Sequence, residues 1–86
     1  MRTIYSQEQI VRTKSIAKII GDSSNVLILY ELMNFGEKSF NELKRMTDIN
    51  AVTLSKKLTV LKAEGLVDCR QHGIENHYFI TAQSDN

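Results

Sequence analysis

The chain has 86 residues, an apolar fraction of 42% and a formal net charge of +1 at pH 7. This composition is typical of one small folded domain and excludes a disordered chain, and the near-neutral charge alone does not indicate a nucleic-acid partner. No apolar run is long enough to cross a bilayer, and no signal-peptide pattern opens the sequence. Because the single cysteine, Cys69, cannot form an internal disulfide, we expect a cytoplasmic protein.

Two helices are expected in the first half of the chain. The first spans residues 6–20, with Ser6 as its N-cap and Gly21 as its C-terminal stop. The second is capped by one of the polar residues 22–24 and is terminated by Gly36. Since apolar residues surround almost all of this second helix, we expect a central core helix that is buried on several sides. One of its sides is alternatively a contact for a partner helix.

Residues 39–65 have the pattern of two helices joined by a tight turn. Ser39 and Glu42 have capping-box spacing at the start of the first helix. Asn50 is expected to cap the second helix, and Gly65 to end it in a left-handed conformation. Apolar residues recur along one face of that second helix: Ala51, Leu54, Leu58 and Leu61. The arrangement is that of a helix-turn-helix.

Residues 66–81 are expected to form a β-hairpin. The segments 66–70 and 77–81 have strand composition, and residues 71–76 between them include glycine and polar turn residues. A helix-turn-helix followed by a hairpin is a winged helix, in which the hairpin is the wing. The predicted fold is therefore α+β, mainly α. It is one winged helix-turn-helix domain over residues 1–86, with four helices and a two-stranded wing.

The outer face of the second motif helix differs from an ordinary solvated surface. It carries small, hydroxylated and basic residues, and no acid precedes Glu64. A solvated helix usually mixes Glu with Lys, whereas a helix without acids suits a groove lined with phosphates. The alternative is an ordinary exposed face. The residues concerned are Val52, Lys56, Thr59 and Ala63, with Thr53, Ser55 and Val60 on the flanks.

Several segments resemble the HxlR family of transcription regulators, and more loosely the ArsR and MarR winged-helix groups. They are Ile20-Gly21, Leu27-Ile28-Leu29, Glu31-Leu32, Gly36, Phe40-Asn41-Glu42-Leu43, Ile49, Leu54, Leu58, Leu61, Glu64-Gly65-Leu66-Val67 and Tyr78-Phe79-Ile80-Thr81. The resemblance implies a homodimer on pseudo-palindromic double-stranded DNA, with the N-terminal helix, residues 1–21, in the dimer interface. The family's C-terminal helix has no counterpart here, so we expect the interface mainly from Ile10, Ile16, Ala17 and Ile20, with Leu29 or Met33 as further candidates.

The candidate DNA contacts follow from helix-turn-helix geometry, in which the start of the second helix reads base edges in the major groove. The residues at that place are Asn50, Val52, Thr53, Ser55 and Lys56. Two lysines further along, Lys57 and Lys62, are assigned to phosphate. On the wing, the candidates are Arg70, His72 and the backbone near Gly73.

Other chemistry has little support in the sequence. Cys69, His72 and His77 are a weak set for a metal site, and Cys69 is expected to be a buried structural thiol. No catalytic motif is present, so we predict neither an enzyme nor a cofactor. The leading hypothesis is a homodimeric, sequence-specific transcriptional regulator, a nucleoid-associated repressor. The alternatives are a winged-helix module that binds a protein, and an architectural or plasmid-partition adaptor that binds DNA.

Overall fold

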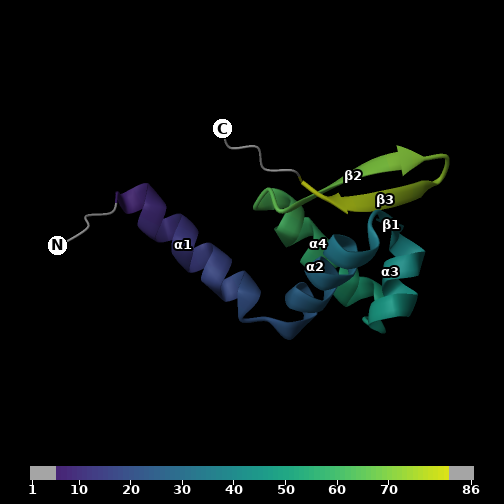
Figure 1. Cartoon of the computed structure of the whole chain (residues 1–86), viewed down its shortest axis with the longest axis horizontal. Coiled ribbons are helices and arrows are strands. Elements are labelled where there is room, and N and C mark those ends of the chain that lie inside the picture. Colours follow the sequence, from purple (N-terminus) through teal and green to yellow (C-terminus); the bar gives the residue numbers. More distant parts are fainter. Residues whose placement is uncertain (1–5, 82–86) are drawn as a thin grey trace.

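The computed structural model describes residues 6–81, except for the side chains of Arg12, Thr13, Ser15 and Ile16. The described chain forms a winged helix-turn-helix, as predicted (Figure 1). Its elements are α1 (Gln7–Ile20), α2 (Ser23–Phe35), β1 (Lys38–Ser39), α3 (Phe40–Thr47), α4 (Ala51–Ala63), β2 (Val67–His72) and β3 (Glu75–Ile80). None of the helices in this part of the chain is long and apolar enough to span a membrane.

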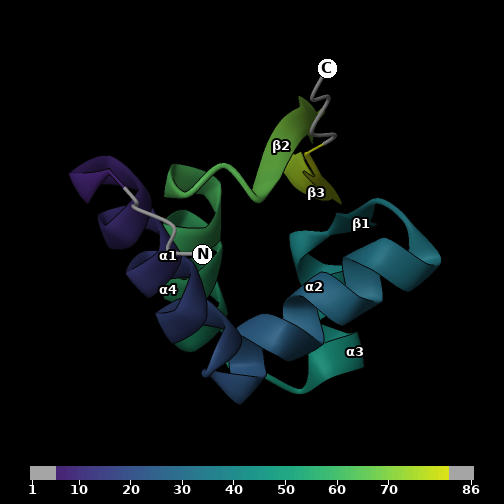
Figure 2. The same cartoon turned by 60° about the vertical axis from the view of Figure 1, so that its left-hand side comes forward.

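α1 projects away from the body that α2, α3, α4 and the sheet form together (Figure 1). The molecule is consequently elongated, with extents of 51 × 27 × 20 Å. Both views place the hairpin and the α1–α2 turn at opposite sides of the molecule (Figures 1 and 2). The apolar core lies among the end of α1, α2, α3, α4 and the start of β2. It consists of Ile19, Ile28, Leu32, Leu43, Leu54, Leu58, Leu61 and Val67.

The sheet contains a strand that the sequence analysis missed. Its order is β1-β3-β2, and all neighbours are antiparallel. β1 pairs with β3 through only two residues, Lys38 opposite Tyr78 and Ser39 opposite His77. Such a short strand shows no alternation of apolar and polar residues, so nothing in its composition indicates it. The expected two-stranded wing is therefore a three-stranded sheet.

The hairpin turn is shorter than expected. The ladder continues to the pair His72–Glu75, which leaves only Gly73 and Ile74 in the turn instead of residues 71–76. Gly73 has a φ of 64°. Glycine with positive φ at the first of two turn positions is the requirement of a type II′ hairpin, which matches the twist of the flanking strands.

Local caps delimit the helices of the motif as predicted. Ser39 and Glu42 form a capping box, in which the Glu42 amide donates to the Ser39 hydroxyl at 3.1 Å and the Ser39 amide to the Glu42 carboxylate at 2.9 Å. The Asn50 side chain accepts from the Thr53 amide at 2.9 Å. Gly65 has a φ of 76°, and the Leu66 amide donates to the Leu61 carbonyl, which is a Schellman cap.

Side chains also cap the first two helices, and the stop at Gly21 differs from the one at Gly65. Ser6 caps α1 in a capping box with Gln9. Asp22 caps α2 by accepting from the Ser24 amide at 2.9 Å. Gly21 ends α1 with a φ of −72°, so this stop does not use the left-handed conformation that only glycine adopts readily.

α2 is buried on one face only, contrary to the expectation of burial on several sides. Its buried residues are Asn25, Ile28 and Leu32. The remaining apolar surface is exposed because α1 projects outward and covers little of α2; it comprises Val26, Leu27, Tyr30, Met33 and Phe35. Ala51, expected on the buried face of α4, is also exposed, since the core contacts come from residues further along that helix.

Candidate nucleic-acid interface

The first turns of α4 present an accessible surface. We call Asn50, Val52, Thr53, Ser55 and Lys56 the leading face of α4. All of them are exposed except Thr53, which is half-buried, and the Val52 side chain is 66% exposed. Leu54, Leu58 and Leu61 hold the opposite side of the helix in the core. The Lys56 ammonium has no ion-pair or hydrogen-bond partner within the described chain. This surface therefore offers one free cation, hydroxyls, an amide and a small apolar side chain.

Lys57 is engaged within the chain. Its ammonium forms an ion pair of 2.5 Å with the carboxylate of Asp22, the N-cap of α2. The hydrogen bond from Lys57 lowers the pKa of Asp22, burial opposes this effect, and the backbone amides of Ser24 and Asn25 lower the pKa further. The pair ties α4 to the start of α2. Lys57 must exchange Asp22 for a phosphate if it is to contact DNA.

Lys62 likewise has a partner. Its ammonium lies 3.3 Å from the Cys69 sulfur on β2, and this hydrogen bond is the main cause of a raised pKa of Lys62. Cys69 is half-buried, so the expectation of a buried thiol is wrong in part. The side chain does lie on the core-facing side of β2, as Val67 does. It is further along the strand, where the flexible side chain of Lys62 covers it instead of the core.

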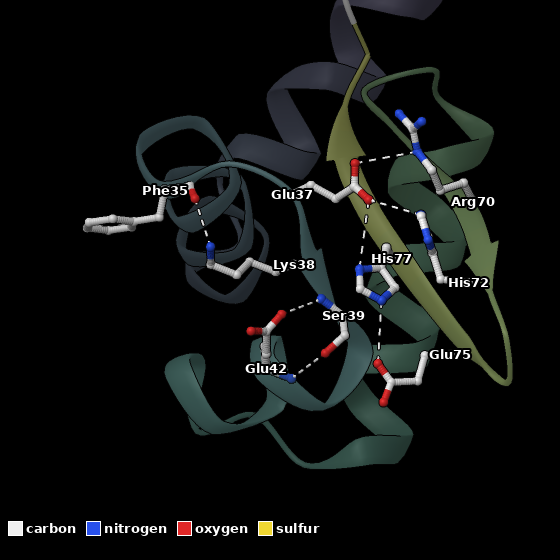
Figure 3. Close-up of polar contacts among 9 residues, drawn as sticks. All are labelled: Phe35, Glu37, Lys38, Ser39, Glu42, Arg70, His72, Glu75 and His77. Carbon is white, nitrogen blue, oxygen red and sulfur yellow. Dashed lines mark hydrogen bonds and ion pairs between the residues drawn. The ribbon is translucent and has the colours of Figure 1, made fainter.

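The wing carries a cluster that the sequence analysis did not anticipate. We call Glu37, Arg70, His72, Glu75 and His77 the wing cluster (Figure 3). One Glu37 oxygen lies 3.4 Å from Arg70 Nε, and the other lies 3.7 Å from His72 Nε2 and 3.8 Å from His77 Nδ1. Glu75 approaches His77 Nε2 at 3.4 Å. Arg70 and His72, both predicted to contact DNA, are therefore next to an acid in this structure.

Aromatic contacts complete the wing cluster. The Arg70 guanidinium lies 4.6 Å above the centre of the Phe79 ring, and the His72 and His77 rings are 4.6 Å apart. Among the described residues, no group of His, Cys, Asp and Glu is arranged to hold a metal ion. In the sequence, the cluster is indicated only by the alternation of charged residues along the two strands. The participation of Glu37 could not be predicted, because Glu37 lies far from the hairpin in the sequence.

The residues expected at a dimer interface are mostly accessible. Ile10 and Ile20 of α1 are 37% and 58% exposed, and Ala17 is exposed as well. The side chain of Ile16 lies outside the described residues. Of the two further candidates, Met33 is 71% exposed, whereas Leu29 packs against the core.

A comparison with protein families gives one match. Residues 19–83 match the model of the HxlR-like helix-turn-helix family. The chain belongs to this family. The family is one of DNA-binding transcription regulators, which are not enzymes. No curated protein sequence matches the chain.

Solved structures share the fold of this HxlR-like chain. HlyU from Vibrio cholerae N16961 is 22% identical, with a TM-score of 0.80 over 91% of this chain and 84% of that one. NolR from Sinorhizobium fredii is 20% identical, with a TM-score of 0.81 over 96% and 84%. A third structure is Mb0332 from Mycobacterium bovis, described as a homodimeric winged helix-turn-helix DNA-binding domain and a possible ArsR-family regulator. It is 25% identical, with a TM-score of 0.78 over 96% and 78%.

Proposed function

We propose that the chain binds specific sites on double-stranded DNA as a homodimeric transcriptional regulator. The observation that carries this proposal is the leading face of α4. It is accessible, contains no acid, and is held outward by the burial of Leu54, Leu58 and Leu61. In a major groove, Thr53 and Ser55 would bond base edges, Val52 would meet a thymine methyl, and Lys56 would reach guanine or phosphate.

The remaining candidates serve the phosphate backbone in this proposal. They are Lys57 and Lys62, and on the wing Arg70, His72 and the backbone amides near Gly73. Asn50, at the N-cap of α4, stays with the residues that face base edges. Phosphate contacts fix the position of a protein on the duplex without reading sequence. Three of the cations, Lys57, Lys62 and Arg70, would first have to leave their internal partners. Their contribution to affinity is therefore smaller than that of free cations.

The exposed apolar surface of α1 and α2 supports the proposed dimer. An open groove of about 670 Å³ lies beside Ile20, and Val26, Leu27, Tyr30 and Ile49 also line it. An exposed apolar groove is typical of a protein contact. We assign it to a second copy of the chain, as Mb0332 is described as homodimeric. Two copies would present two leading faces to half-sites about one helical turn apart, on a pseudo-palindromic site.

Repression is the simplest regulatory outcome. Occupancy of a promoter site is sufficient to exclude the transcription machinery, whereas activation requires an additional favourable contact with it. We therefore propose a repressor. The alternatives are a module that binds a protein and a partition adaptor that binds DNA, and the DNA-binding experiment below distinguishes both from a repressor.

Selection of bound duplexes from random DNA, followed by affinity measurements at several salt concentrations, tests DNA binding. We expect a two-fold symmetric consensus. The affinity should fall about 100-fold or more between about 50 and 200 mM salt, because bound phosphates release counterions. Absence of binding at low salt, or a flat salt dependence, would favour the protein-binding module. Binding without sequence preference would favour the architectural or partition adaptor.

Sedimentation at tens of micromolar tests the dimer. We expect the wild-type chain to sediment as a dimer and Ile20→Asp as a monomer, because the variant would bury an unpaired charge in the interface. Ile74→Asp is the matched control, because Ile74 is 98% exposed in the turn between β2 and β3. Figure 1 shows this turn on the side of the molecule away from α1. A monomeric wild type that binds one chain per DNA site would contradict the proposal.

A further inference from the structure

Both histidines of the chain lie in the wing cluster. In the β2–β3 ladder, Arg70 is opposite His77 and His72 is opposite Glu75. Since opposite residues share a face and residues two apart do so as well, these four side chains stand on the same face of the hairpin. Glu37 reaches them from the segment between α2 and β1. Three elements thus contribute charge to one small surface.

The charge of this surface depends on the histidines. Histidine is the side chain that ordinarily changes charge between about pH 5 and 8, whereas arginine and carboxylates keep theirs. With neutral rings, the two carboxylates outweigh Arg70 and the wing cluster has a net charge of minus one. With both rings protonated, the net charge is plus one. His72 is 55% exposed and His77 is 26% exposed at their side chains, so His72 is open to solvent and His77 partly so.

Other charged groups near the cluster have partners of their own. The Lys38 ammonium of β1 donates to the Phe35 carbonyl at 2.7 Å. The Glu42 carboxylate of α3 accepts from the Ser39 amide in the capping box. Neither forms an ion pair with a histidine ring in the described structure (Figure 3). Asp68 stands two residues before Arg70 on the same face of β2, and its carboxylate accepts from the Cys69 amide at 2.8 Å. The five side chains of the wing cluster, together with Asp68, therefore set the local charge.

We infer that the wing cluster makes DNA binding sensitive to protons. The inference rests on the proposed DNA-binding function. When the rings are neutral, Glu37 competes with DNA phosphates for Arg70 and repels the duplex. When the rings are protonated, they neutralise Glu37 and Glu75, and Arg70 becomes available to phosphate. Because nearby phosphates favour the protonated rings, binding takes up protons, and the affinity rises as the pH falls.

Affinity measurements with the full chain and a selected duplex, from pH 7.5 to 5.5 at constant salt, test this inference. We expect the wild type to bind about ten-fold more tightly at pH 5.5 than at pH 7.5, the size of one charge-assisted contact. The double variant His72→Gln/His77→Gln should change by less than about two-fold over the same range. The chain has no other histidine, and thiols ordinarily titrate at higher pH. A terminal amine, with an ordinary pKa of about 7.7–8.0, accounts for any small change that the double variant retains.

Glu37→Gln gives an independent test, because this variant should strengthen DNA binding at pH 7.5. Removing the acid should tighten binding at pH 7.5 several-fold and reduce the further gain at pH 5.5. This variant decides the question if the double histidine variant does not fold, which circular dichroism would show.

Two outcomes would overturn the inference while leaving DNA binding intact: a wild-type affinity that is independent of pH, or a pH dependence that both variants retain. Failure of the wild type to bind any duplex at low salt and any pH would instead overturn the proposed function itself, and this inference with it.

Discussion

The two surfaces that carry candidate DNA-binding cations, the leading face of α4 and the wing cluster, differ in what surrounds those cations. Lys56 on α4 has no internal partner within the described chain, and no acid occurs between Ala51 and Ala63. Arg70 and His72 on the wing lie beside Glu37. A free cation loses only water when it meets a phosphate, whereas a paired one must also give up its acid. The comparison favours α4 as the surface for base readout and the wing as the surface for regulation.

The largest expected effect separates the two faces of α4. Leu54→Ala should lower the free energy of unfolding by about 2–5 kcal/mol, because Leu54 is fully buried and its loss leaves a cavity. Val52→Ala, two residues away on the exposed face, should change it by less than about 0.5 kcal/mol. Denaturant unfolding measures both. A large loss of stability in Val52→Ala would show that the leading face contributes to the stability of the fold. It would contradict the assignment of this face to DNA binding alone.

The second effect sharpens the contrast between base readout and positioning. Thr53→Ala or Lys56→Ala should reduce the preference for the selected site over random DNA by about 1–3 kcal/mol, the size of a lost base contact. Arg70→Ala should weaken binding to both DNAs to a similar extent and leave the preference unchanged. Competition binding measures this ratio. If Arg70→Ala alone altered the base preference, readout would have to be reassigned to the wing.

The smallest effect concerns the ion pair between Asp22 and Lys57 of α4. The lowered pKa of Asp22 means that its stabilising contribution is present above its ordinary pKa of 3.8 and is lost as the pH falls below that value. Asp22→Asn removes the charge but keeps a residue that caps helices well. We expect the variant to be less stable than the wild type at pH 6, and the difference to shrink toward pH 2.5. Thermal unfolding at the two pH values is the measurement. If the stability difference between variant and wild type were the same at both pH values, the loss would come from the N-cap of α2 and not from the ion pair with Lys57.

Much of the fold could be predicted because its signals are local. The box of Ser39 and Glu42, the cap at Asn50 and the Schellman stop at Gly65 each involve residues within one or two turns of a helix. Such hydrogen bonds depend on spacing along the chain, so the residue pattern is sufficient to locate them. The accessible start of α4 followed from the same reasoning, since the period of the leucines determines which side of the helix faces the core.

The sequence by itself therefore determined the helices, their ends, the hairpin and the outward side of α4. Only the tertiary structure decided that Lys57 meets Asp22, that Lys62 meets Cys69, and that Glu37 joins two histidines. It also decided that β1 pairs with β3 and that most of the apolar surface of α2 stays uncovered. These contacts join residues that are separate in the chain. Their existence depends on how α1, α2 and the wing are oriented, and no local spacing encodes that orientation.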